Sequence, residues 1–236
     1  PYDRTSLYFA EALEEFAPGQ FDVQIFPNRQ LGDEKEMIEG VGFGTLDMAV
    51  ITNSPISRIS APFQINDMPF IYPSAEHAHE ILDGPVGQKL LSTLEPKGIV
   101  GLGFAEGGFR HMINNVRPIK KADDVSGIKW RVMPNPVYIE MFRALGGNAV
   151  PMPWGEVFTA IQQGTVDGLE IPLPVIYSTG YYETVEYCSL TNHTYSALGV
   201  LFSKRKFDDL TSEQQNVVRK ATRSAIERER EQNKKN

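Results

Sequence analysis

An arginine on a predicted strand is the strongest candidate for chemistry in this chain. Arg131 lies in the predicted strand 128–132, and Trp154 follows further along the chain. A guanidinium group presents a planar fork of N–H donors that matches a carboxylate in two parallel hydrogen bonds. Trp130 and Val132 would point to the opposite face of the strand and anchor it in a core, which leaves Arg131 facing a cleft. We therefore predict that Arg131 captures an acidic ligand.

Two further residues could extend this site. Arg110 stands between Phe109 and His111 on another predicted strand, so two arginines would form a local positive pocket in an acidic protein. Trp154 opens a predicted helix, where its ring could stack on the carbon skeleton of a ligand. A core position is the alternative interpretation of Trp154, and a surface ion pair is the alternative for either arginine.

Other motif-like patterns do not predict a second chemistry. The glycines of 40–44 follow a helix and those of 101–103 lead into a strand, so neither places a phosphate at a helix N-terminus. His77 and His79 are two residues apart on a predicted helix and point to different faces, which favours solvated helix surface over a metal site. No nucleophile turn accompanies His111, so we expect no catalytic residue, metal or cofactor.

The composition argues against several classes of function. The 236 residues include 30 acidic and 23 basic side chains, and the resulting formal charge of −7 disfavours binding to nucleic acid. The sequence contains no run of 18 apolar residues, and its beginning lacks the pattern of a secretory signal. The single cysteine, Cys188, excludes an intrachain disulfide and is compatible with either the cytosol or the periplasm.

The elements around these residues follow an α/β rhythm. Apolar residues at helical spacing predict helices near 9–16, 33–41, 86–94, 136–145 and 153–163. Alternation and apolar runs predict strands at 21–25, 48–51, 99–104, 109–113, 128–132, 149–152 and 166–169, with two more near 187 and 197. Asn135 and Pro136 suit a helix start, and Thr211 with Gln214 predicts a capping box that opens a long C-terminal helix.

Three sequence blocks carry a family resemblance that extends over nearly the whole chain. They are Lys129–Val132, Met152–Gly164 and Val166–Glu170, and Pro27–Asp33 and Gly44–Ala49 support them. In this order and spacing they resemble the solute-binding proteins of TRAP transporters, the DctP-type receptors for organic acids.

The resemblance implies an α/β, two-lobed fold similar to type II periplasmic binding proteins, with crossing strands and a long C-terminal helix that spans both lobes. Lobe 1 would comprise residues 1–107 with 197–236 returning to it, and lobe 2 residues 108–196. A uronate, an aldonate or a C4-dicarboxylate would bind between the lobes, which would close by a hinge motion. The receptor would be periplasmic, with its signal peptide absent from this chain, would not insert into the membrane, and would deliver its ligand to membrane subunits.

The resemblance also implies roles for individual residues. Arg131 falls where the family's arginine pairs with the ligand carboxylate, Arg110 matches a second arginine, and Trp154 matches an aromatic residue that lines the pocket. Ile171 stands where many members have asparagine after the glutamate, and an apolar side chain cannot make that amide contact, which disfavours a ligand like sialic acid. The predicted ligand-binding residues are Arg131, Arg110, Trp154, Glu170, Asn135, Thr52 and Ile171.

Two other classes of function stay open at this point. A ligand-sensing domain of a transcription regulator would need a DNA-binding helix pair, which neither end of the sequence shows. A lyase or isomerase for small acids could use Glu170 or Glu156 as a base. Glu156 is also explained by a favourable interaction with a helix dipole, and Glu170 by an ion pair with an arginine in the lobe interior.

Overall fold

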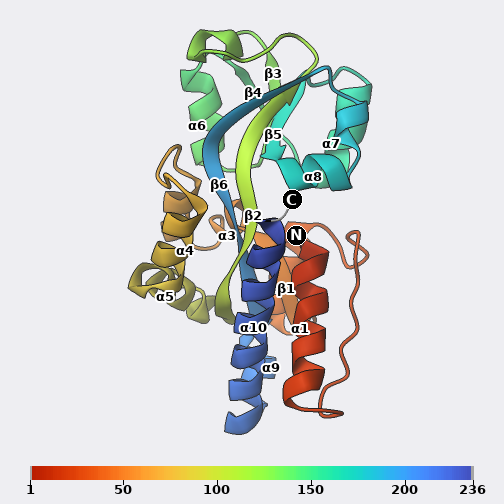
Figure 1. Ribbon diagram of the computed structural model, residues 1–236, viewed down its shortest axis with the longest axis vertical. Helices are drawn as coiled ribbons and strands as arrows, with labels where there is room; N and C mark the ends of the chain where they lie inside the picture. Colours follow the sequence, from red (N-terminus) through yellow and green to blue (C-terminus); the bar gives the residue numbers. More distant parts are fainter. Residues whose placement is uncertain (1, 235–236) are drawn as a thin grey trace.

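The computed structural model describes residues 2–234, which form two groups of elements joined by two long strands (Figure 1). We call the lower group in the figure lobe 1 and the upper group lobe 2. The elements of lobe 1 are α1 (Tyr2–Phe16), α2 (Glu34–Phe43), β1 (Met48–Thr52), α3 (Asn53–Ile56), α4 (Ala75–Asp83), α5 (Pro85–Ser92), α9 (Lys204–Asp208) and α10 (Ser212–Asn233). Those of lobe 2 are β3 (Lys129–Val132), α6 (Pro136–Ala144), β4 (Asn148–Pro151), α7 (Trp154–Gln162), β5 (Gly168–Pro172) and α8 (Leu173–Ser178).

The two joining strands are β2 (Ile99–Asn114) and β6 (Tyr187–Ser203), which run antiparallel through both lobes. They lie in one six-stranded sheet of order β1-β6-β2-β5-β3-β4, in which β3 is parallel to β4 and β5. Short 3-10 helices complete the described elements at Ala61–Asp67, Glu95–Lys97, Ala122–Val125 and Tyr181–Glu183.

The pairing of β2 with β6 is interrupted where the strands pass from one lobe to the other. The register shifts between Glu106 and Gly108, and again between Arg110 and Met112. Gly108 has φ of 93°, and a Cβ atom on Gly107 would lie 2.8 Å from the Ser196 hydroxyl, so both positions require glycine. Bulges of this kind bend and twist a strand locally. The bend therefore occurs near the predicted lobe boundary at 107/108, which itself stays a prediction.

Local sequence signals account for several helix starts. The Asn135 side chain accepts a hydrogen bond from Val137 N, and Pro136 occupies the first turn of α6. Thr211 and Gln214 form the predicted reciprocal capping box of α10. These hydrogen bonds satisfy backbone donors that a helix N-terminus leaves unpaired.

Each lobe has its own apolar core. Buried side chains of α1 and α10, among them Phe9 and Ala221, pack together on one side of lobe 1. In lobe 2, Trp130 of β3 is fully buried and its ring centroid lies 5.3 Å from that of Phe142 in α6. Separate cores allow two lobes to move relative to each other without exposing either core.

The structure corrects three predictions about these elements. Residues 21–25 form no strand, because their backbone pairs with no neighbouring strand among the described residues. The alternation of their side chains also does not bury one face, since Val23 is 36% exposed. The two strands predicted at 99–104 and 109–113 are one strand, β2. The two strands predicted near 187 and 197 are likewise one strand, β6. The irregularities between the predicted segments bend these strands without ending them.

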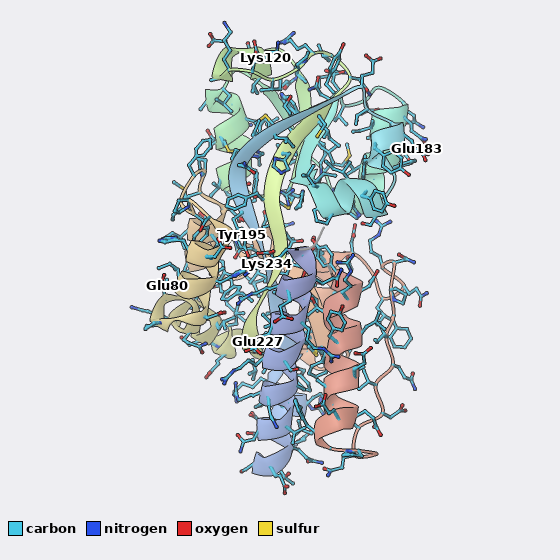
Figure 2. The ribbon with its side chains drawn as sticks, viewed as in Figure 1. Glu80, Lys120, Glu183, Tyr195, Glu227 and Lys234 are labelled. Atoms are coloured by element: carbon cyan, nitrogen blue, oxygen red, sulfur yellow. The ribbon has the colours of Figure 1, made fainter. Side chains whose placement is uncertain are left out.

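The long C-terminal helix is α10. Within the described residues it packs on lobe 1 and reaches the junction of the lobes (Figure 1), and its predicted extent over both lobes stays a prediction. In Figure 2, Glu227 marks the body of this helix, Lys234 lies at the junction of the lobes, and Lys120 lies at the far end of lobe 2. Among residues 2–234, no helix combines the length and apolar character needed to cross a membrane.

Candidate ligand-binding cleft

A large cleft opens at the junction of the lobes and contains most of the predicted ligand-binding residues. Its volume is about 2160 Å³, and it continues along lobe 1 beside α1 and residues 21–31. This volume exceeds the roughly 300–1000 Å³ of a pocket for one small molecule, so a ligand would occupy only part of it. The predicted residues that line it are Arg131, Arg110, Trp154, Thr52 and Ile171.

Arg131 is a buried cation without an ion-pair partner among residues 2–234. Its side chain is held in place because Nε and Nη2 donate to the Met152 carbonyl oxygen at 3.0 and 2.8 Å. The residue is only 2% exposed, and burial lowers the pKa of the guanidinium to about 10. Within the described chain no hydrogen bond involves Nη1. A buried charge of this kind is costly unless an opposite charge pairs with it, so an anion in the cleft would be stabilised.

Arg110, the second predicted arginine, already has a carboxylate partner. Its Nη2 donates to Glu170 Oε1 at 2.9 Å and to the Glu170 carbonyl at 2.7 Å, while Nε donates to Oε2. His193 Nε2 lies 3.4 Å from the same carboxylate. Burial would raise the pKa of Glu170, but the charge and hydrogen bonds of Arg110 together with His193 hold that pKa below its ordinary value. The charge of Arg110 is thus compensated, and a ligand contact from Arg110 or Glu170 stays a prediction.

Asn135 is turned away from the cleft. Its amide nitrogen donates to Ser57 Oγ at 2.7 Å and to Asp67 Oδ2 at 2.9 Å, both in lobe 1, while its oxygen caps α6. The residue is fully buried and does not line the cleft. These contacts link the two lobes and give Asn135 a structural role. They do not support the predicted contact between Asn135 and the ligand.

The remaining predicted residues form walls of the cleft. Trp154 is half-buried, with its ring centroid 5.4 Å from that of Tyr181 and 5.6 Å from Cζ of Arg131. Ile171 is 2% exposed and contributes an apolar surface. The Thr52 hydroxyl lies 2.6 Å from the hydroxyl of Tyr2. An aromatic and an aliphatic wall beside a cation suit a ligand with a carboxylate and a carbon chain.

Several charged residues outside the predicted set also line the cleft, among them Glu34. Glu34, at the start of α2, lines the cavity, and its Oε1 accepts a hydrogen bond from Thr52 N at 2.8 Å. Burial raises the pKa of this carboxyl group. The available signal was its place directly after the loop Pro27–Asp33, but an acid in the first turn of a helix is ordinarily explained by the helix dipole.

A contact across the mouth of the cleft connects the lobes. Gly155 N, in the first turn of α7, donates to Asp33 Oδ2 at 3.3 Å, and Arg29 Nη1 lies 3.6 Å from Asp33 Oδ1. Asp33 belongs to lobe 1 and Gly155 to lobe 2. A carboxylate at a helix N-terminus is favoured by the free N–H groups there, so this contact stabilises the present arrangement of the lobes.

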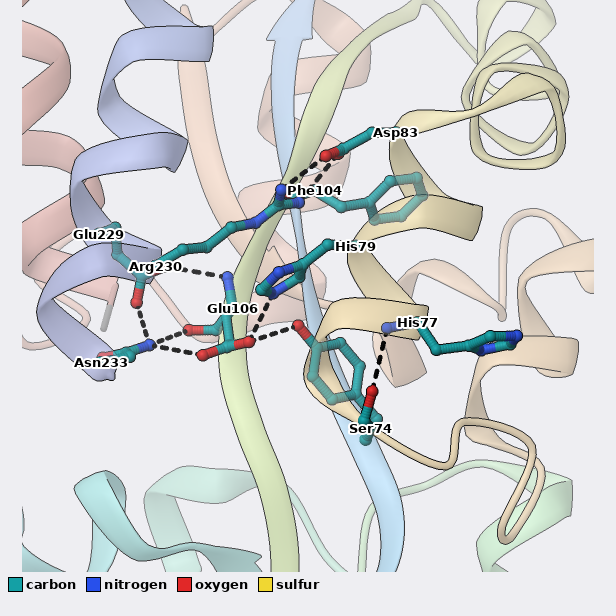
Figure 3. Close-up of polar contacts among 10 residues, drawn as sticks. Ser74, His77, His79, Asp83, Phe104, Glu106, Glu229, Arg230 and Asn233 are labelled. Carbon is teal, nitrogen blue, oxygen red and sulfur yellow. Dashed lines mark hydrogen bonds and ion pairs between the residues drawn. The ribbon is translucent and has the colours of Figure 1, made fainter. Parts of the chain in front are cut away.

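A polar network lies where α10 meets the crossing strand β2 (Figure 3). Glu106 Oε2 lies 2.6 Å from His79 Nε2 and accepts a hydrogen bond from Tyr195 at 2.9 Å. Glu106 N donates to Glu229 Oε2 at 3.0 Å, and burial raises the pKa of Glu229 to about 7. The prediction of a solvated His79 is wrong, because α4 packs against β2 and brings the imidazole to Glu106. No group of three potential metal ligands occurs among residues 2–234.

Comparison with known proteins agrees with this geometry. The family described as bacterial extracellular solute-binding protein, family 7 (DctP) matches residues 1–236. A solute-binding protein of Verminephrobacter eiseniae is 41% identical over 91% of the chain, which spans 64% of that relative.

Solved structures give the same result. A TRAP periplasmic solute-binding protein from Polaromonas sp. JS666, bound to D-erythronate, has a TM-score of 0.95 and 38% identity, with 98% of this chain and 76% of that chain covered. The sugar acid binding protein DctPAm from Advenella mimigardefordensis, in complex with galactonate, has a TM-score of 0.93 and 36% identity, with 98% and 76% covered. The predicted two-lobed α/β fold is thereby confirmed, and the chain belongs to family 7 of the bacterial extracellular solute-binding proteins.

Proposed function

We propose that this protein captures a sugar acid between its lobes and delivers it to the membrane subunits of a TRAP transporter. The observation that carries the proposal is the buried Arg131, which lines the cleft and has no ion-pair partner within residues 2–234. The carboxylate of a ligand would supply the missing charge. Both groups lose hydration on pairing, so the pair fixes the orientation of the ligand more than it adds to total affinity.

The chemistry of the similar proteins supports a sugar acid. D-Erythronate and galactonate, the ligands of the two similar structures, each have one carboxylate and several hydroxyl groups. The cleft offers a cation for the carboxylate of such a ligand. It offers the hydroxyl of Thr52 and the carboxylate of Glu34 for the hydroxyl groups. A C4-dicarboxylate is the alternative ligand that the sequence left open, and a direct comparison of the two classes separates them.

Hinge closure is the proposed mechanism of capture. The separate cores of the lobes, the register shifts of β2 and β6 at the junction, and the Asp33 contact to Gly155 all fit a rigid-body motion. A ligand that contacts both lobes shifts the population toward the closed arrangement. The size of the shift depends on the difference between its affinities for the closed and the open arrangement. Release would then follow when a membrane partner favours the open arrangement.

Binding without chemical change is preferred over an enzymatic role. Glu170, a base candidate, is fully buried and paired with Arg110, which leaves it poorly placed to accept a proton from a ligand. Glu156 is exposed at the start of α7 and does not line the cleft. We further propose a periplasmic location, because the family is extracellular.

A ligand screen tests the proposal. Erythronate, galactonate, glucuronate, succinate and malate are added separately to the purified protein, and the shift in melting temperature is measured, followed by calorimetric titration of every acid that raises it. Sugar acids are expected to raise the melting temperature by mass action. The bound acid is then released and analysed by NMR. Failure of every acid to bind, or recovery of a chemically altered acid, would contradict the proposal.

A further inference from the structure

We propose that three side chains in the last two turns of α10 bind the uncovered edge of β2 and confine the bending between the lobes to residues 107–110. This role rests on the proposed hinge closure and goes beyond it by naming the element that limits the motion. We call Glu229, Arg230 and Asn233 the clasp residues. Each forms a hydrogen bond with the backbone of β2 directly before the bend near the junction (Figure 3).

One edge of β2 is only partly covered by a neighbouring strand. On one side β2 pairs with β6 from Ile99 to Asn114, with three register shifts. On the other side it pairs with β5 only at residues 110–114. Within residues 2–234, the edge of 99–109 on this second side therefore has no strand partner. Backbone groups on such an edge need other partners, because an unpaired polar group in a buried strand is costly.

Side chains of α10 supply these partners. Glu229 Oε2 accepts a hydrogen bond from Glu106 N at 3.0 Å, and Asn233 Nδ2 donates to the Glu106 carbonyl at 3.1 Å. Arg230 Nη2 donates to the Phe104 carbonyl at 2.8 Å. Phe104 and Glu106 are two positions apart in a strand, so their backbone groups point to the same edge. The end of α10 thus takes the place of a neighbouring strand where β2 leaves lobe 1.

The clasp is anchored to other elements of lobe 1. Arg230 Nη1 and Nη2 donate to the Asp83 carboxylate of α4 at 2.6 and 2.9 Å. The Glu106 carboxylate accepts a hydrogen bond from Tyr195 of β6 and lies 2.6 Å from His79 Nε2 of α4. The backbone of β2 is therefore fixed to α4, β6 and α10 as far as Glu106, and this part should move with lobe 1 as a rigid unit.

Bending can begin only after Glu106. The register of β2 against β6 shifts between Glu106 and Gly108, and Gly108 has φ of 93°, a conformation that glycine adopts readily. The pairing with β5 begins at Arg110 and fixes the strand to lobe 2 from there on. Loss of the clasp would extend the flexible segment back toward Phe104 and widen the range of lobe orientations.

Hydrogen exchange of the Glu106 amide, measured by NMR without ligand, tests the contact itself. Glu229→Leu removes both acceptor oxygens and keeps a buried side chain, so this amide should exchange about tenfold faster or more. Glu229→Gln keeps an oxygen that can accept from the amide, so its exchange should stay within about threefold of the wild type. Amides of residues 110–114, which pair with β5, should exchange as in the wild type and show that lobe 2 is intact.

Spin labels on the two lobes test the consequence for the hinge. Gln88 of α5 and Glu183, in the 3-10 helix that follows α8, are exposed. Each is replaced by cysteine in a Cys188→Ser background, because Cys188 is itself exposed. Double electron–electron resonance without ligand should give a distance distribution about 1.5-fold wider or more for Glu229→Leu than for the wild type, and Glu229→Gln should resemble the wild type.

Two further variants complete the series. Asn233→Ala removes the contact with the Glu106 carbonyl close to the end of the helix, so it tests the clasp even if Glu229→Leu does not fold, and it should widen the distribution in the same direction. Glu227→Leu changes an exposed acid on the same helix and should leave both measurements as in the wild type. Melting temperatures establish which variants are folded.

The outcomes separate the clasp from a purely structural contact and from the proposed function. Faster exchange of the Glu106 amide with an unchanged distance distribution would overturn the proposal, because the contact would then not limit the hinge. Equal widening by Glu229→Leu and Glu227→Leu would overturn it as well. Both measurements use the ligand-free protein, so they decide on the clasp even if no sugar acid binds, and sugar-acid binding can stand if the clasp is refuted.

Discussion

Replacement of Arg131 by methionine should separate binding from stability. Arg131 is 2% exposed and lacks an ion-pair partner within residues 2–234, so the free protein carries the cost of a buried charge. Methionine has a similar length and no charge, and it would remove this cost along with the two hydrogen bonds to Met152. We expect sugar-acid binding to collapse while the ligand-free protein stays folded and nearly as stable.

The magnitude follows from the contacts that Arg131 makes and those it has available. Loss of one partner of a buried, hydrogen-bonded charge pair costs about 2–5 kcal/mol, which corresponds to a roughly 30- to 5000-fold weaker affinity. In the free protein, loss of the hydrogen bonds to Met152 costs about 1–3 kcal/mol, and relief of the buried charge acts in the opposite direction. The net change in the free energy of unfolding should therefore be within about 2 kcal/mol of zero.

Calorimetric titration with galactonate and erythronate measures the affinity, and urea denaturation without ligand measures the stability. Arg131→Lys serves as the matched comparison: it keeps the charge but loses the planar fork, so its affinity should be intermediate. Unchanged affinity in Arg131→Met would refute the assignment of Arg131. A large loss of stability without ligand would show that this arginine is a structural residue.

Three further predictions concern contacts at the junction. Asn135→Ala removes the cap of α6 and a donor to the buried Asp67. The free energy of unfolding in urea should therefore fall by about 2–4 kcal/mol, while sugar-acid affinity should change less than threefold. Lost affinity with intact stability would mean that Asn135 contacts the ligand. Asp33→Ala removes the contact to Gly155 across the cleft mouth. Ligand release, measured by stopped flow, should therefore be about 3- to 10-fold faster. An unchanged release rate would show that this contact does not stabilise the closed arrangement. Burial raises the pKa of Glu229 to about 7, so the stabilising contribution of its protonated form is complete below the ordinary glutamate pKa and is lost as pH rises through about 7. The stability of the wild type relative to Glu229→Gln should therefore decline between pH 5 and pH 8, and a constant difference would contradict this assignment.

Local signals in the sequence predicted much of the fold. Asn135 with Pro136, and Thr211 with Gln214, predicted helix starts correctly, because a cap depends on residues only two or three positions apart. The strand predicted at 21–25 was wrong, because alternation describes a strand with one buried face but does not supply a partner strand. Continuity of β2 through its glycines depends on pairing with β6, which is distant in sequence.

The site could be predicted only in part for the same reason. The residue type and strand context of Arg131 were enough to predict a buried cation facing the cleft. An ion pair of Glu170 with an arginine was an expected alternative, but Arg110 could not be assigned as that arginine, because the two residues are 60 positions apart and meet only through the pairing of β2 with β5. The direction of the Asn135 amide depends on Ser57 and Asp67 in the other lobe. Individual residue types therefore predicted the buried cation of the cleft better than the set of contacts around it.

The most direct test of the account is a crystal structure of the protein with galactonate bound. We predict that the galactonate carboxylate lies between the lobes with its oxygens about 2.7–2.9 Å from the Arg131 guanidinium nitrogens, the range for charge-assisted hydrogen bonds. A galactonate molecule bound in the cleft with its carboxylate away from Arg131 would contradict the account.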